Sequence, residues 1–322
     1  MSAPGRPKRE GGQHAATAAW TPRGFAAYRQ FYPATPAIAH RDATAATAAF
    51  IDAWEAAPVP AMRASKNDAG VTFVFVRGLF GSWIPGHLTA PLHAVREAGA
   101  EAFIARSRAA GTIDANARML AADIERRAPG HARLIFLCHS KGGLDLLEAL
   151  RHTPELRHRA AAIVLCQTPR RGCAVLESVL LGAHRDSLRA LRGRASEAVA
   201  RAAIGGAGAR AGCLELTGDT LAARIDDLDA IAAAIPTLAV ATWSVEPSAW
   251  LDSQHARLGA IRPHCAHDGL FFLEDLDWPM AAQVLLPRVD HSQPCVGGLG
   301  FPHDRFWRTL AQLALARAEG AA

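Results

Sequence analysis

The segment CHSKGG at positions 138–143 places Ser140 between a run of apolar residues and a leucine-rich run with a different spacing. A chain that turns sharply from strand to helix at a serine needs small residues nearby, as in the G-x-S-x-G nucleophile elbow. Gly142 matches the second glycine of that pattern, whereas Cys138 replaces the first one. We interpret Ser140 as a candidate nucleophile; an ordinary helix N-cap serine is the alternative interpretation.

A serine nucleophile needs a histidine base and a carboxylate that orients the base. Asp268 lies in a turn-like Asp-Gly pair, and His291 follows the last predicted strand. Serine, acid and histidine therefore occur in the order that accompanies this type of elbow. The glycines of the segment 78–81 let the backbone turn close to a ligand. The backbone N–H groups of Leu79 and Lys141 are the candidate donors to a developing oxyanion.

Two other aspartates compete for the role of the acid. Asp219 begins a predicted helix, where an aspartate stabilises the helix N-terminus. Asp290 adjoins His291, but adjacent side chains of extended backbone point in opposite directions. Both remain alternatives to Asp268.

Four other histidines are weighed as the base and are assigned lesser roles. His139 cannot easily turn back on the adjacent serine, so we expect it to be packed or hydrogen-bonded locally. His264 and His267 flank the acid loop and are expected at the surface or behind the site, and His303 is expected to cap the closing helix.

The polar residues of the helix after Ser140 are expected to be solvated. Asp145 and Glu148 are assigned to its outer side, and the Lys141 side chain is expected to project to solvent or towards substrate.

Short runs of β-branched and aromatic residues predict buried strands. The predicted strands cover 71–76, 101–106, 134–138, 161–166, 236–243 and 283–289, and predicted helices cover 113–127, 142–150 and 304–318. Strands that alternate with helices predict an α/β fold with a mainly parallel central sheet flanked by helices. Pro287 suits an edge strand because it has no N–H to donate.

The domain organisation is predicted to be simple. Residues 1–20 have the composition of a disordered tail, and residues 21–322 are expected to form a single domain. Within it, residues 21–66 are Ala-rich and expected to be helical, and residues 173–212 form a helical insertion.

The insertion has two interpretations. It is either an ordinary helical cap with a basic face formed by Arg185, Arg189 and Arg192, or a mobile lid over an apolar acyl pocket, with glycines at 205, 206 and 208 as a hinge. Four residues are candidates to line that pocket, namely Trp83, Ile84, Leu176 and Leu180.

Composition excludes several classes of function. The net charge is +5, but arginines are scattered and aromatics are sparse, which argues against a nucleic-acid partner. The first twenty residues lack the apolar core of a signal peptide, and we expect a cytoplasmic protein. No two cysteines have CxxC spacing, so we expect no structural zinc site and assign no metal ligand. A disulfide among Cys173, Cys213, Cys265 and Cys295 is left open.

Together these motifs resemble bacterial triacylglycerol lipases and esterases of the α/β-hydrolase fold. The resemblance rests on VRGLFG at 76–81, HSKGG at 139–143, TPRRG at 168–172, DGL at 268–270 and DH at 290–291, with Leu-Thr at 216–217 as a weaker match. The matches follow the family's order over about residues 71 to 292. The resemblance implies that Ser140 is the nucleophile, His291 the base and Asp268 the acid.

The chain departs from the family pattern at two further positions. Arg77 stands where the family has a histidine, so the oxyanion loop can differ in arrangement. The family's calcium-site aspartate is not seen after His291, where Ser292, Gln293 and Pro294 follow. We therefore expect no cofactor and no complete calcium site.

The resemblance predicts hydrolysis of an apolar ester or lipid through an acyl-enzyme. A small-molecule ester or lipid is the expected partner, with transient contact to a lipid surface as a further expectation, and the oligomeric state is left undetermined. The alternatives are a polyester (polyhydroxyalkanoate) depolymerase, a thioesterase or an acyltransferase with the same three residues. A non-catalytic binding scaffold is the second alternative.

Overall fold

The computed structural model describes residues 20–23, 43–56, 70–188, 194–244 and 252–320. The predicted tail 1–20 and the helical region 21–66 therefore lie mostly outside the described residues. Within them, Trp20 and the helix α2 (Ala43–Glu55) are described.

A six-stranded sheet with the order β2-β1-β3-β4-β5-β6 forms the centre of the described chain, and all its neighbouring strands are parallel. The strands are β1 (Val71–Val76), β2 (Glu101–Ile104), β3 (Arg133–His139), β4 (Ala160–Cys166), β5 (Thr237–Trp243) and β6 (Ala282–Pro287). The predicted α/β class with a mainly parallel sheet is confirmed. The sixth strand ends two residues earlier than predicted because Arg288 adopts a positive φ of 58°, which extended backbone does not allow.

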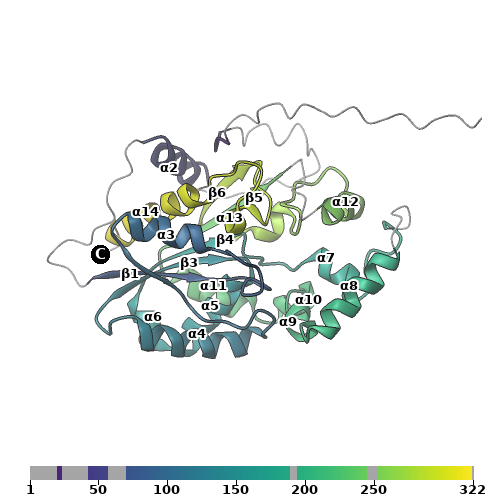
Figure 1. The fold of residues 1–322 in the computed structure, drawn as a ribbon, viewed down its shortest axis with the longest axis horizontal. Helices are drawn as coiled ribbons and strands as arrows, with labels where there is room; N and C mark the ends of the chain where they lie inside the picture. The colour runs from purple at the N-terminus through teal and green to yellow at the C-terminus, as the bar shows by residue number, and fades with distance from the viewer. Residues whose placement is uncertain (1–19, 24–42, 57–69, 189–193, 245–251, 321–322) are drawn as a thin grey trace, which may run out of the picture.

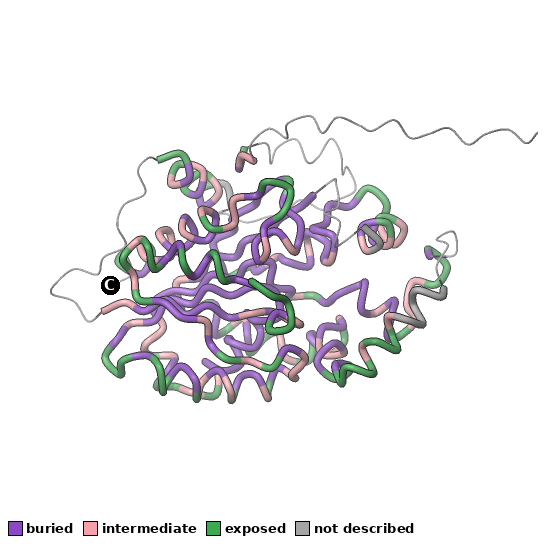
Figure 2. The backbone as a smooth tube through the Cα atoms, in the orientation of Figure 1, coloured by how far each residue is buried: buried purple, intermediate pink, exposed green. Residues whose placement is uncertain are grey.

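Helices cover both faces of the sheet (Figure 1). One layer contains α2, α3 (Thr89–Glu97), α13 (Gln293–Val296) and α14 (His303–Gly320), and the other contains α4 (Ile113–Arg127), α5 (Lys141–His152), α6 (Pro154–Arg159) and α11 (Ile225–Ala233). Alternate residues of one strand enter opposite cores: Phe73 and Phe75 face the first layer, and Val74 and Val76 face the second. Figure 2 shows the sheet as the buried centre of the fold.

The remaining helices lie near the carboxyl ends of the strands (Figure 1). They are α7 (Ala174–Leu180), α8 (Arg194–Gly206), α9 (Arg210–Leu214), α10 (Gly218–Ala222), α12 (Asp252–Ile261) and a 3-10 helix η2 (Leu273–Leu276). The helices α7 and α8 fall in the predicted insertion 173–212, and α9 extends two residues beyond it. Arg189 and Arg192 of its predicted basic face lie outside the described residues.

The edge strand β6 is completed by the beginning of the described chain. Leu285 donates its N–H to Oγ1 of Thr47 at 3.0 Å, and the Pro287 carbonyl accepts from Nε1 of Trp20 at 3.1 Å. The prediction that Pro287 suits a sheet edge is confirmed.

None of the helices in the described ranges combines the length and the apolar character that crossing a membrane requires.

Candidate active site

The candidate site lies between the carboxyl ends of β1 and β3. From β1 the chain continues to β2 on one side of the sheet, and from β3 it continues to β4 on the other side. Open parallel sheets bind ligands in the crevice beyond the carboxyl ends of strands at such a point. The loop with Leu79 follows β1, and Ser140 follows β3.

Ser140 has φ 55° and ψ −135°, a strained conformation for a residue with a side chain. The neighbouring glycines make this turn fit. A Cβ on Gly142 would lie 2.5 Å from the carbonyl oxygen of Arg77, and one on Gly78 would lie 2.8 Å from the Ser140 Cβ. Cys138 packs fully buried in the core, so its small side chain is accommodated where the pattern has glycine.

Ser140, His291 and Asp268 are joined by hydrogen bonds. His291 Nε2 lies 3.0 Å from Ser140 Oγ, and His291 Nδ1 lies 2.8 Å from Asp268 Oδ2. The His291 N–H also donates to the Asp268 carbonyl at 2.8 Å, which holds the two loops together.

The carboxylate of Asp268 is fully buried and well satisfied. Its Oδ1 accepts the N–H groups of Leu270 at 2.9 Å and Phe271 at 2.8 Å. These bonds compensate for the loss of hydration and leave Oδ2 directed at the imidazole. A buried carboxylate held in this way fixes both the orientation and the tautomer of His291.

The rival aspartates occupy other positions. Oδ1 of Asp290 accepts from the N–H and hydroxyl of Ser292 and the N–H of Gln293 at the start of α13. Asp219 lies in the first turn of α10, as expected for a residue that stabilises a helix N-terminus.

The rival histidines are also engaged elsewhere. His139 Nε2 lies 3.0 Å from Gln167 Oε1, and His264 is exposed. His267 is buried against His255, with ring centroids 4.7 Å apart, and burial lowers its pKa to about 4. His303 is the first residue of α14.

The loop after β1 lies against the elbow. Leu79 lines the cavity beside Ser140, and Lys141 is the first residue of α5, where helix N–H groups have no partner within the helix. Arg77 Nε donates to the His87 carbonyl at 3.3 Å, so the residue that replaces the family's histidine braces this loop. Burial lowers the pKa of Arg77.

The Lys141 side chain contradicts the expectation from the sequence. It is fully buried, and its Nζ lies 2.5 Å from Asp145 Oδ1. The other oxygen of Asp145 accepts from Asn116 Nδ2 at 2.8 Å. Burial raises the pKa of Asp145 to about 6, and Lys141 acts in the opposite direction.

Glu148 is also buried rather than solvated; its carboxylate accepts from Arg151 Nη2 at 2.8 Å and lies 3.0 Å from His152 Nε2. The elbow helix α5 is enclosed between α4 and α11, with Lys141 and Asp145 as a buried pair and Glu148 paired with the more exposed Arg151.

A cavity of about 360 Å³ opens beside Ser140 and His291. Its walls are mostly apolar and include Ile84 and, from the insertion, Leu176 and Ile204. Two of the predicted lining residues are elsewhere: Trp83 is 53% exposed, and Leu180 packs in the core.

All six cysteines are free thiols. No disulfide joins Cys173, Cys213, Cys265 and Cys295, which answers the question that the sequence left open.

No protein-family model and no curated protein matches the chain. Its fold is similar to that of solved structures. A metagenomic carboxyl esterase has a TM-score of 0.56 at 19% identity, over 94% of this chain and 97% of that one. The mature lipase BlEst2 of Bacillus licheniformis has a TM-score of 0.55 at 19% sequence identity, over 76% of this chain and 93% of that one. The Staphylococcus hyicus lipase has a TM-score of 0.52 at 13% sequence identity, over 81% of this chain and 99% of that one. The likeness confirms the α/β-hydrolase fold.

Proposed function

From this fold and geometry, we propose that the chain is a serine carboxylic-ester hydrolase that acts on apolar esters. The observation that carries the proposal is the hydrogen-bonded series Asp268–His291–Ser140 at 2.8 and 3.0 Å, built on a strained turn beside an apolar cavity. An N-cap serine has no need of a buried histidine and carboxylate aligned on its hydroxyl.

The reaction proceeds through an acyl-enzyme. With Nδ1–H donated to Asp268, the Nε2 lone pair of His291 accepts the proton of Ser140 Oγ as the oxygen attacks the ester carbonyl. The tetrahedral oxyanion is stabilised by the backbone N–H groups of Leu79 and Lys141. His291 then protonates the leaving alcohol, and a water activated by His291 releases the carboxylic acid.

The apolar cavity supports the proposal that the acyl group of the substrate is apolar and binds there. Its lining from the oxyanion loop and from α7 and α8 is mainly aliphatic and aromatic. Residues of the insertion, including Leu176 and Ile204, form part of this lining, which supports the cap as a substrate-binding element.

The test is hydrolysis of p-nitrophenyl esters of short, medium and long acyl chains at pH 7 to 9. Ser140→Ala should abolish turnover and labelling by a fluorophosphonate. Asp268→Asn should lower kcat by about 10⁴-fold because the imidazole loses the acceptor that fixes its tautomer. Asp219→Asn is the matched control and should retain wild-type kcat.

Each outcome separates the alternatives. If the protein shows no turnover and Ser140 is not labelled, the proposal of an enzyme is refuted and a binding scaffold is favoured. Labelling without turnover of simple esters would require the panel to be extended to polyhydroxyalkanoate, acyl thioesters and acceptor alcohols. A loss of activity in Asp219→Asn instead of Asp268→Asn would reassign the acid.

A further inference from the structure

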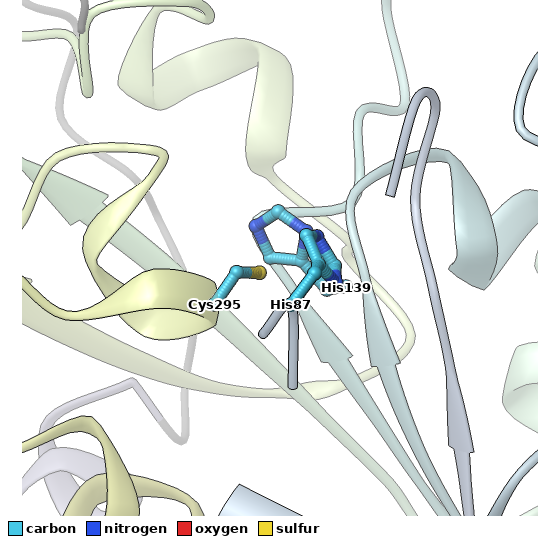
Figure 3. A group of neighbouring side chains, drawn as sticks. All are labelled: His87, His139 and Cys295. Atoms are coloured by element: carbon cyan, nitrogen blue, oxygen red, sulfur yellow. The ribbon is translucent and has the colours of Figure 1, made fainter. Parts of the chain in front are cut away.

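Three side chains that the proposed reaction does not use meet next to His291. They are His87 from the loop before α3, His139 from the end of β3 and Cys295 from α13, and all three are buried (Figure 3). One ligand atom from each lies within 4.8 Å of the other two. The three residues also line the cavity beside Ser140.

The hydrogen bonds of Gln167 fix the tautomer of His139. Gln167 Nε2 donates to Thr242 Oγ1 at 2.6 Å and to the Asp290 carbonyl at 2.9 Å, so its Oε1 is an acceptor. His139 Nε2 lies 3.0 Å from that oxygen and 3.1 Å from the His291 carbonyl, and both positions require a donor. The proton is therefore on Nε2, and Nδ1 carries a free lone pair.

Two buried ring nitrogens lack the partners that buried polar atoms normally have. Nδ1 of His139 and Nδ1 of His87 form no hydrogen bond with any described part of the chain. Gly78 places no side chain next to His139 Nδ1, where a Cβ would lie 3.4 Å from the nitrogen. An unpaired buried acceptor beside a thiol and a second imidazole is the arrangement expected of metal ligands.

The geometry points to a binding site for Zn²⁺ formed by His87, His139 and Cys295, with a fourth coordination position that opens into the cavity beside Ser140. Two imidazoles and one thiolate are the donor set that suits this ion. Zn–N distances of about 2.0–2.1 Å and Zn–S of about 2.3 Å require ligand atoms roughly 3.3–3.6 Å apart, so side-chain rotations must bring the three ligand atoms closer together.

The surroundings of the two histidines meet other requirements of such a site. His139 donates Nε2–H to two oxygens, which orients the ring as the outer hydrogen bonds of metal-bound histidines do. Burial lowers the pKa of His87 to about 3, so its imidazole is neutral and able to ligate. Burial raises the pKa of the Cys295 thiol, which opposes formation of the thiolate, and Arg77 acts the other way; the bound ion itself must therefore drive the loss of the thiol proton.

Binding is balanced by loss of one proton. The Cys295 S–H proton passes to solvent as the S–Zn bond forms, and the ion keeps a water in the open position. The occupied site places a cation and its water in the cavity used by the substrate. We therefore expect Zn²⁺ to inhibit ester hydrolysis reversibly; this part alone rests on the proposed function.

The binding test uses the metal-free full chain without a polyhistidine tag and Co²⁺ as a spectroscopic substitute for Zn²⁺. One equivalent of Co²⁺ should produce a thiolate-to-cobalt charge-transfer band in the near ultraviolet, and Zn²⁺ should displace it. Cys295→Ala should lose the band and His87→Gln should weaken it. The matched controls Cys265→Ala and the exposed His93→Gln should keep it.

The wild-type spectrum decides the proposal even if a variant fails to fold. Absence of the band in the wild type, or its full retention in Cys295→Ala, would overturn the site. In the activity arm, Zn²⁺ should lower the initial rate and a chelator should restore it, whereas Cys265→Ala should respond as the wild type does. A chain that binds Co²⁺ through Cys295 but hydrolyses no ester would leave the metal site standing and refute only the proposed function. Binding without inhibition would refute the obstruction of the cavity.

Discussion

Lys141 and Asp145 form a buried ion pair beneath the candidate nucleophile, and a double-mutant cycle can measure it. Both side chains are at most 2% exposed, and Nζ and Oδ1 are 2.5 Å apart. Lys141→Met retains the methylenes and the backbone N–H that the proposed mechanism needs, and it leaves the Asp145 carboxylate without its cation. Asp145→Asn retains an acceptor for Asn116 and leaves the ammonium without its anion.

The magnitude follows from this environment. Removal of one partner of a buried pair should lower the free energy of unfolding by about 3–5 kcal/mol at pH 8. The double variant removes both charges and keeps the Asn116 hydrogen bond, so its loss should be only about 0–2 kcal/mol. The coupling energy of the cycle should then be at least about 4 kcal/mol.

The pH dependence of Lys141→Met gives an independent check. The pKa of Asp145 is already raised to about 6 with the lysine present, and the variant raises it further. A folded-state pKa above the unfolded value near 3.9 means that the folded protein binds the extra proton between those values. The loss caused by Lys141→Met should therefore be full at pH 8 and should shrink towards pH 5.

The assay is urea unfolding of the four proteins at pH 8 and pH 5, followed by circular dichroism. Fluorophosphonate labelling of the folded variants should persist because the backbone N–H at position 141 remains. The account of a buried, charged pair would be refuted if the double variant lost as much unfolding free energy as the two single variants together. It would also be refuted if the loss in Lys141→Met did not change with pH.

Three other perturbations have defined outcomes. Burial raises the pKa of Asp275 to about 7, so its ionisation lowers the free energy of unfolding as pH rises from about 4 to 7. Asp275→Asn should make this decrease less steep. An unchanged dependence of the unfolding free energy on pH would contradict the assignment. Gly143→Ala should destabilise the elbow and lower labelling of the nucleophile, since its Cβ would lie 2.3 Å from Thr168 Oγ1; Thr168→Ala should restore part of the loss, and no restoration would exclude this clash. Leu176→Trp should narrow the cavity and lower kcat/KM for long acyl chains more than for acetate; equal losses would place Leu176 away from the acyl group.

The sequence predicts the sheet well because the physical signal is local. Each strand of a parallel sheet covered on both faces is a short, nearly continuous apolar run, and these runs are visible without the fold. The order of Ser140, Asp268 and His291 was equally visible, and the structure brings the three side chains together. Their catalytic roles remain proposals.

Burial of charged residues was harder to predict. A lysine beside glycines suggests an exposed turn, yet Lys141 is enclosed because α5 lies between the sheet, α4 and α11. The spacing i,i+4 between Lys141 and Asp145 was an available signal of their pairing.

The cluster of His87, His139 and Cys295 gave no such signal. Its members are separated by 52 and 156 residues in the printed sequence and meet only through the fold. Metal motifs read from sequence depend on ligands spaced a few residues apart, which this cluster lacks.

The closure of β6 by Trp20 and Thr47 has a consequence for synthesis on the ribosome. Thr47 precedes its partner Leu285 by 238 positions, which takes roughly 12–48 s to translate at about 5–20 residues per second. During that interval β6, the strand against which α2 packs, does not yet exist, although Phe50 and Trp54 of α2 are buried in the folded protein. The apolar side chains of α2 therefore lack this partner until β6 has been synthesised.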